Sequence, residues 1–220
     1  MTHSLAPGIS FAETSGRLVF LDAIADRYTM LAPEAEAALR AMMEAEQPVA
    51  PTDGWAARLR ALGLIVGNAS GTRIAPCKAQ RAERSALDRP LPGAGVRAVS
   101  MAYVGYATSR AALRRGGLAR ELARLERSRS SGTGPRVSPN AVSRETAAFA
   151  ALRRWATPLD QCLPLSLALA RRCATHDARV KLVLGVKLRP FRAHAWVQCE
   201  GVILNDHVDA VRPFAPVLVV

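Results

Sequence analysis

Residues 160–206 constrain the fold of this 220-residue chain more than any other stretch. Cys162 and Pro164 stand at its start, and an alternation of leucine and alanine follows as far as Ala170. Proline has a fixed φ and no backbone N–H, so Pro164 fits only the first turn of a helix. The pattern therefore predicts a helix that begins at or just after Cys162. Free N–H groups and the positive end of the helix dipole would face the sulfur there, an environment that favours a thiolate and can hold an oxyanion.

Two strands joined by a turn at Glu200 and Gly201 are expected to follow this helix. Side chains alternate between the two faces of a strand, so the length of the turn decides whether His194 and Asp206 meet. A two-residue turn would pair His194 with His207 and leave Asp206 on the opposite face. A three-residue loop that starts at position 199, with Gly201 in the left-handed conformation, pairs His194 directly with Asp206. We expect the three-residue loop.

Cys162, His194 and Asp206 follow one another in an order that suits a cysteine-nucleophile triad. Asp206 can accept a hydrogen bond from one imidazole nitrogen and leave the other for the thiol. Each residue also has a purely structural interpretation, since free cysteines often pack as small hydrophobes and a lone histidine often serves a core hydrogen bond. His176, at a predicted helix end, is expected to be a cap. His207 would replace Asp206 as the neighbour of His194 only in the two-residue register.

The chain resembles the lasso-peptide biosynthesis B protein family in three motifs. This family is a transglutaminase-like, papain-related group of cysteine proteases that remove the leader from a ribosomally made precursor peptide. The motifs surround the cysteine, the histidine and the aspartate: Asp160-Gln161-Cys162-Leu163-Pro164 with Ser166-Leu167-Ala168-Leu169, Pro190-Phe191-Arg192-Ala193-His194-Ala195-Trp196-Val197, and Leu204-Asn205-Asp206.

The resemblance implies that Cys162 is the nucleophile, that His194 is the general base and acid, and that Asp206 orients His194. It also implies an α+β fold in which helices pack on an antiparallel sheet. The freed core peptide would pass to an asparagine-synthetase-like cyclase that closes a macrolactam. The cleavage itself demands no cofactor, and any ATP requirement would belong to the cyclase.

Charge divides the chain near residue 80. Residues 1–80 carry 7 basic and 8 acidic side chains, residues 81–150 carry 13 and 5, and residues 151–220 carry 10 and 5. We therefore expect a domain at 1–80, a Pro- and Gly-containing linker at 81–95, and a second domain at 96–220. Without a signal peptide, a long apolar run or a Cys/His metal spacing, the sequence predicts a cytoplasmic protein with reduced cysteines and no membrane contact.

Residues 8–75 are expected to form short strands, two helices and a terminal strand, which is a winged-helix-like outline. DNA binding is not expected, because this domain is slightly acidic and phosphate binding needs a concentrated basic face. The segment resembles the PqqD-like precursor-recognition element, which holds a leader peptide as an added strand. By this resemblance the substrate-binding residues lie on the third strand and the second helix, where packing roles remain an alternative: Tyr28, Met30, Trp55, Arg58 and Leu59.

Three helices are expected over 96–115, 118–129 and 140–155, the first two separated by Gly116 and Gly117. Met101 and Val104 are expected to face inward. Three other functions remain open on the sequence alone: a transglutaminase-like acyltransferase with the same triad, a non-catalytic peptide-binding protein, and a nucleic-acid-binding regulator.

Overall fold

The computed structural model describes residues 2–44, 54–68, 73–130, 139–153, 161–176 and 179–220. The first part of the chain contains two small antiparallel sheets and two helices. β2 (Ile9–Thr14), β3 (Arg17–Asp22) and β4 (Arg27–Met30) form one sheet in that order, and β1 (Thr2–Leu5) pairs with β5 (Ile65–Asn68) in the other. α1 (Pro33–Glu44) and α2 (Gly54–Ala61) lie between β4 and β5 in sequence. The expected strands and helices of this region are therefore present.

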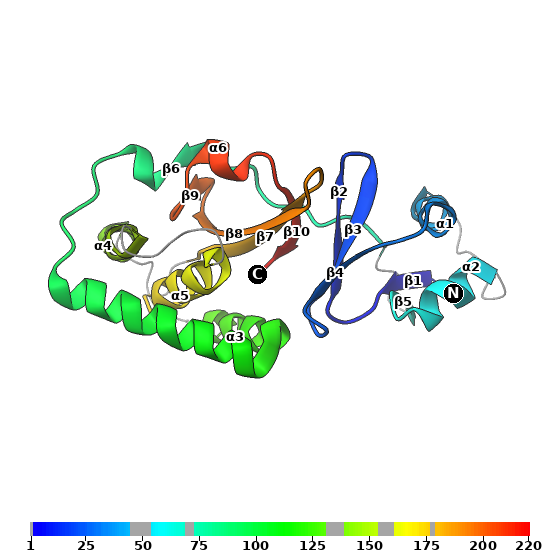
Figure 1. Cartoon of the computed structure of the whole chain (residues 1–220), viewed down its shortest axis with the longest axis horizontal. Helices are drawn as coiled ribbons and strands as arrows, with labels where there is room; N and C mark the ends of the chain where they lie inside the picture. The colour runs from blue at the N-terminus through cyan, green and yellow to red at the C-terminus, as the bar shows by residue number, and fades with distance from the viewer. Residues whose placement is uncertain (1, 45–53, 69–72, 131–138, 154–160, 177–178) are drawn as a thin grey trace.

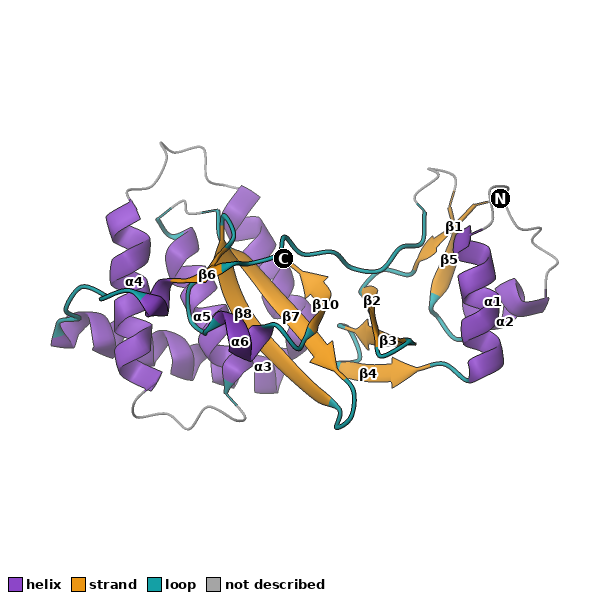
Figure 2. Ribbon diagram, turned by 90° about the horizontal axis from the view of Figure 1, so that it is seen from above, coloured by secondary structure: helices purple, strands orange, loops and turns teal. Residues whose placement is uncertain are grey.

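The second part is a sheet with helices packed on one face. α3 (Val96–Ser130), α4 (Pro139–Arg153) and α5 (Cys162–Ala174) precede β7 (Lys181–Lys187), β8 (Arg192–Cys199) and β9 (Val202–Ile203), and α6 (Val208–Val211) precedes β10 (Ala215–Val219). α5 packs directly on β7 and β8, and α3 and α4 pack against α5. α6 lies on the opposite face of the sheet (Figures 1 and 2).

The five-stranded sheet is mixed, so the expectation of an antiparallel sheet was only partly right. The strand order is β10-β7-β8-β9-β6, and the first four strands are antiparallel neighbours. β6 (Arg84–Ser85) joins the edge parallel to β9, because the chain enters there from the N-terminal part before it turns into α3. A 3₁₀ turn, η1 (Ala86–Asp88), follows at once, so the expected linker contributes a strand to the sheet.

The sheet β2-β3-β4 packs on both of its faces, as the alternation of its side chains requires. One face, with Phe11, Leu18 and Phe20, packs against α1, α2 and β5. The other face lies against β10 and β7 and belongs to the same core cluster as α3, α4 and α5. The residues that it adds to that cluster are Ala12, Val19, Leu21 and Ala23. The two parts of the chain therefore share a hydrophobic core, at the place where the β2-β3-β4 sheet lies beside β10 (Figure 1).

α3 breaks at Gly117, where φ is 71°, so the expected interruption is present. Its first half faces the core with Ala102 and Tyr106. The expectation for Met101 and Val104 was wrong, since their exposed fractions are 43% and 58%. Among the described helices, none is long and apolar enough to cross a membrane. Trp155 and residues 45–53, which directly precede α2, lie outside the described part of the chain.

Candidate active site

Cys162 is the first residue of α5, as the position of Pro164 predicts. The first helical hydrogen bond runs from the Leu165 N–H to the Gln161 carbonyl over 3.1 Å. The thiol is free and partly buried. The nearby backbone N–H groups of Leu163 and Ala195 act to lower the pKa of the thiol. The helix start therefore presents a thiol that several donors already surround.

His194 lies on β8 and meets Asp206 directly, with 2.8 Å between Nε2 and Oδ2. The imidazole packs between Trp196 and Phe214, whose ring centres lie 6.1 and 5.2 Å from its own. Its register partner on β7 is Gly185. A side chain there would come within 2.9 Å of both aromatic residues, so the glycine leaves the room that the imidazole and its neighbours occupy.

The expected register of the β8–β9 turn was wrong, although His194 and Asp206 do meet. Cys199 pairs with Val202, so the turn has two residues, Glu200 and Gly201. Both have positive φ, 47° and 78°, the combination that a type I′ turn requires. The ladder ends at Ile203. Asp206 therefore lies beyond the strand, and the alternation of strand faces does not govern where its side chain points.

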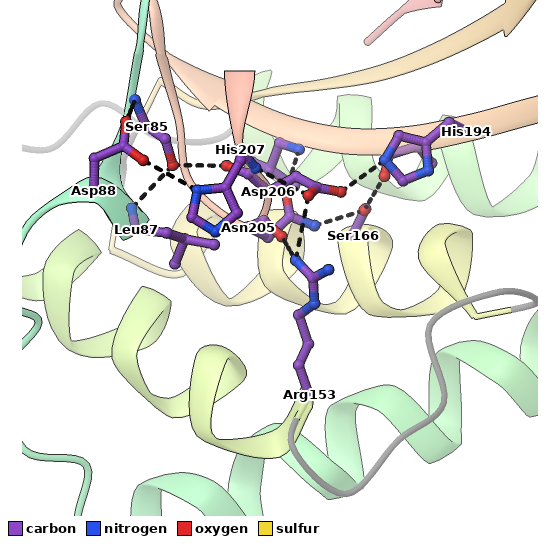
Figure 3. A network of polar contacts seen from close by, with 11 residues as sticks. Ser85, Leu87, Asp88, Arg153, Ser166, His194, Asn205, Asp206 and His207 are labelled. Atoms are coloured by element: carbon purple, nitrogen blue, oxygen red, sulfur yellow. Dashed lines mark hydrogen bonds and ion pairs between the residues drawn. The ribbon is translucent and has the colours of Figure 1, made fainter. Parts of the chain in front are cut away.

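Asn205 ends the ladder. Its Oδ1 accepts the Val197 N–H over 2.8 Å, and its Nδ2 donates to the Ser166 hydroxyl over 2.8 Å. The fully buried Ser166 donates in turn to the Ala195 carbonyl over 2.8 Å (Figure 3). Ser166 lies one turn after Cys162, Ala195 follows His194, and Asn205 precedes Asp206. This network therefore joins the three backbone segments that carry the candidate triad.

Asp206 is held on several sides. Arg153 at the end of α4 lies 3.7 Å from its Oδ1 and also donates to the Asn205 carbonyl. The His207 N–H donates to Oδ1 over 2.9 Å, and Ser85 Oγ donates to the Asp206 carbonyl over 2.6 Å (Figure 3). Burial alone would raise the pKa of Asp206, but the His194 hydrogen bond, the Arg153 charge and the His207 N–H together lower it. Asp206 is therefore a carboxylate at neutral pH.

The pKa values of the thiol and the imidazole shift in opposite directions. Burial raises the pKa of Cys162, but the hydrogen bond and charge of His194, with the Ala195 and Leu163 N–H groups, outweigh burial and lower it. Burial lowers the pKa of His194, but Asp206 and Cys162 raise it to about 9. The arrangement thus favours a thiolate–imidazolium pair, the reactive form of a cysteine nucleophile.

A cavity of about 450 Å³ opens beside Cys162 and His194. Its apolar wall includes Phe149, Leu165 and Phe214. Its charged lining residues are Arg153, Lys187, Arg192, Asp206 and Asp209. The thiol therefore faces a space large enough for several atoms of a peptide, with basic side chains at its edge.

Residues 103–219, more than half of the chain, match the model of the transglutaminase-like superfamily. The chain belongs to this superfamily. A segment of 47 residues is 38% identical to the microcin J25-processing protein McjB of Escherichia coli. The aligned segment covers 21% of this chain and 23% of that protein, so the match spans about a quarter of the relative's length. No solved structure matches the chain.

The residues predicted to bind substrate lie at different distances from the transglutaminase-like site. Tyr28 is close, because its ring centre lies 5.5 Å from that of Phe191 on the β7–β8 hairpin. Burial, with the charges of Asp26 and Cys162, raises the pKa of Tyr28 to about 12. Met30, the last residue of β4, is 52% exposed.

The three predicted residues of α2 lie on a helix far from this site, beyond the β2-β3-β4 sheet, and differ in exposure (Figure 1). The Arg58 guanidinium lies 5.0 Å from the Trp55 ring centre. Leu59 is fully buried in the core with Phe11 and Phe20. This burial suits the packing role that the sequence left open for Leu59.

His176 and His207 have structural partners. His176 Nε2 lies 2.9 Å from Glu145, which also pairs with Arg172, so it ties α5 to α4. His207 Nδ1 lies 3.0 Å from Asp88 and does not take the place of Asp206 (Figure 3). Sequence analysis did not identify Arg153, which contacts Asp206 and Asn205 from the end of α4.

Proposed function

We propose that this chain is a cysteine peptidase that binds a ribosomally made lasso-peptide precursor and removes its leader. The observation that carries the proposal is the geometry of Cys162, His194 and Asp206 at the head of a cavity. The similarity to the microcin J25-processing protein over the segment of 47 residues supports it.

In the proposed reaction, the Cys162 thiolate attacks the carbonyl of the bond between leader and core. N–H groups at the start of α5 stabilise the oxyanion, and the His194 imidazolium donates a proton to the leaving amine. The neutral imidazole then takes a proton from water, which attacks the thioester and releases the leader with a free carboxylate. Asp206 keeps the imidazole oriented and stabilises its charged form throughout.

We further propose that residues 1–80 form a winged-helix-like recognition domain, that 81–95 is the linker, and that 96–220 is the peptidase domain. Among the described residues no strand pairs with the outer edge of β4, so its backbone can accept an added strand. Tyr28 lies near the site, whereas the chain after Met30 leads away into α1. A leader whose C-terminal end must reach Cys162 would therefore run antiparallel to β4, beside Met30, with Trp55 and Arg58 as further contacts.

The freed core peptide would pass to an asparagine-synthetase-like cyclase. Because the residue types of the triad also suit transfer of the acyl group to an amine, a transglutaminase-like acyltransferase is the second candidate. The two reactions differ in the mass of the product.

The test is to incubate the purified chain with the precursor peptide encoded beside its gene and to measure product masses, with Cys162→Ala in parallel. We expect a single cut that adds one water and disappears in Cys162→Ala. A product joined to an added amine would support the acyltransferase instead. An intact precursor that still binds would indicate a peptide-binding role without catalysis. The absence of both cleavage and binding would refute the proposal.

A further inference from the structure

Two basic side chains face each other across the β7–β8 hairpin beside the candidate active site. Lys187 and Arg192 are register partners, and Gly185 with His194 form the pair two positions along. Side chains two residues apart on a strand share a face, so both cations lie on the face that carries His194. Both also line the cavity that contains Cys162.

This pair is not neutralised. Neither cation forms an ion pair with any residue in the described part of the chain, and the Lys187 Nζ lies over the Phe214 ring at 5.2 Å. Arg153, the third cation of the cavity, already contacts Asp206. Asp209, the remaining acidic lining residue, is exposed on α6. Like charges directly opposite each other destabilise a sheet, so the pair has a cost in the empty site that a bound anion would remove.

We propose that Lys187 and Arg192 form a subsite for a side-chain carboxylate of the substrate peptide. The inference rests on the proposed function, because it assumes that a peptide lies across Cys162. Two strand residues span about 7 Å, so an extended substrate would place the recognised Asp or Glu within about two residues of the cleaved bond. A guanidinium and an ammonium on opposite strands can both donate to one carboxylate.

The test uses the cognate precursor and a version in which each Asp or Glu within two residues of the cleaved bond is replaced by Asn or Gln. We measure kcat/KM for both peptides with the wild type, Lys187→Gln and Arg192→Gln. Binding of both peptides to Cys162→Ala is measured separately. Lys181→Gln is the matched control, since Lys181 is exposed on the same strand and face but does not line the cavity.

We expect each subsite variant to lower kcat/KM for the carboxylate peptide by about 10- to 100-fold, the usual scale of a charge-assisted contact, and to leave the amide peptide unaffected. Tm should stay the same or rise, because the substitution removes a repulsion. Lys181→Gln should match the wild type with both peptides.

Two results would overturn the subsite: equal rates and affinities for carboxylate and amide peptides in the wild type, or a precursor with no acidic residue near its cleaved bond. Absence of any cleavage by the wild type would instead count against the peptidase. In that case the affinities for Cys162→Ala still decide whether the subsite exists.

Discussion

The Asn205 side-chain amide donates to the Ser166 hydroxyl over 2.8 Å, and so joins the residue before Asp206 to the helix that begins at Cys162. The Oδ1 of the same side-chain amide accepts the Val197 N–H, which would bond to a backbone carbonyl if β9 continued. One side chain thus ends the strand and connects it to the helix. The position of the carboxylate beside His194 depends on this exchange.

Asn205→Ala should therefore loosen the site. It removes the acceptor of the Val197 N–H and the donor to Ser166, which together should lower the free energy of unfolding by about 1–3 kcal/mol. We also expect kcat/KM to fall by more than the loss of stability explains. The alkaline limb of the pH profile should shift to lower pH, because His194 loses its contact with Asp206. Asn140→Ala, at an exposed position of α4, is the control and should change neither property.

Cys162 should be the first cysteine to react with iodoacetamide at pH 6–7. Its pKa is lowered by His194 despite burial, whereas burial raises the pKa values of Cys77, Cys173 and Cys199. Peptide mass mapping after brief alkylation should find the label at Cys162, and His194→Ala should slow labelling at this pH by at least 10-fold. Uniform labelling of all four thiols would contradict the thiolate–imidazolium pair.

Asp206→Asn should shift the pH dependence in a defined direction. The wild-type imidazolium loses its proton near pH 9, so kcat/KM should rise as Cys162 ionises and fall as the pH passes about 9. Removal of the carboxylate charge moves the pKa of His194 toward its ordinary value of 6.5, so the falling limb should move to lower pH. The maximum rate should drop by about 10²–10⁴-fold. An unmoved falling limb would argue that another group sets it.

Gly185→Ala should damage both stability and activity. The added Cβ would lie 2.7 Å from the Trp196 ring and 2.9 Å from the Phe214 Cβ, and both rings pack on His194. Overpacking of this kind costs about 1–3 kcal/mol, measurable by urea unfolding. Gly105→Ala is the matched substitution, because its Cβ would meet only Ala168 at 3.7 Å within a helix. That variant should be as stable as the wild type or more so.

Alanine substitutions of Leu59 and Met30 should distinguish a role in core packing from a role in leader binding. Leu59→Ala removes a fully buried side chain and should lower the free energy of unfolding by about 2–5 kcal/mol. Met30→Ala, at an exposed position of β4, should leave the unfolding curve nearly unchanged and weaken leader binding in a fluorescence anisotropy assay. Unaltered leader affinity in Met30→Ala would remove this residue from the proposed recognition surface.

Local sequence signals predicted the elements of the site better than their relative placement. Pro164 fixed the helix start, and the apolar runs located β7 and β8, because these depend on residues close in sequence. The turn register was wrong because Glu200 and Gly201 both adopt positive φ and form a two-residue turn. His194 and Asp206 still meet because the Asn205 side chain ends the ladder before Asp206, a feature that the turn pattern does not contain.

Contacts between distant segments left no signal of their own. The strand Arg84–Ser85 has only two residues and no alternation, so its parallel pairing with β9 could not be read from the pattern. Arg153 is one arginine among many, and only the packing of α4 brings it to Asp206. Met101 and Val104 have the spacing of core residues, but they lie on a part of the α3 surface that the packing against α5 leaves exposed.

The shared core has a consequence for anyone who exchanges parts of this protein. Val19 and Leu21 belong to the same core cluster as residues of α5 and β7, so a chimaera that replaces residues 1–80 must reproduce the inner face of the β2-β3-β4 sheet as well as its outer edge. A graft chosen only for its affinity for a new peptide would pack poorly against the core of the transglutaminase-like part. If the leader binds as proposed, the part that can be exchanged to change specificity is the solvent-facing edge of β4, and the rest of the sheet is scaffold shared with the transglutaminase-like part.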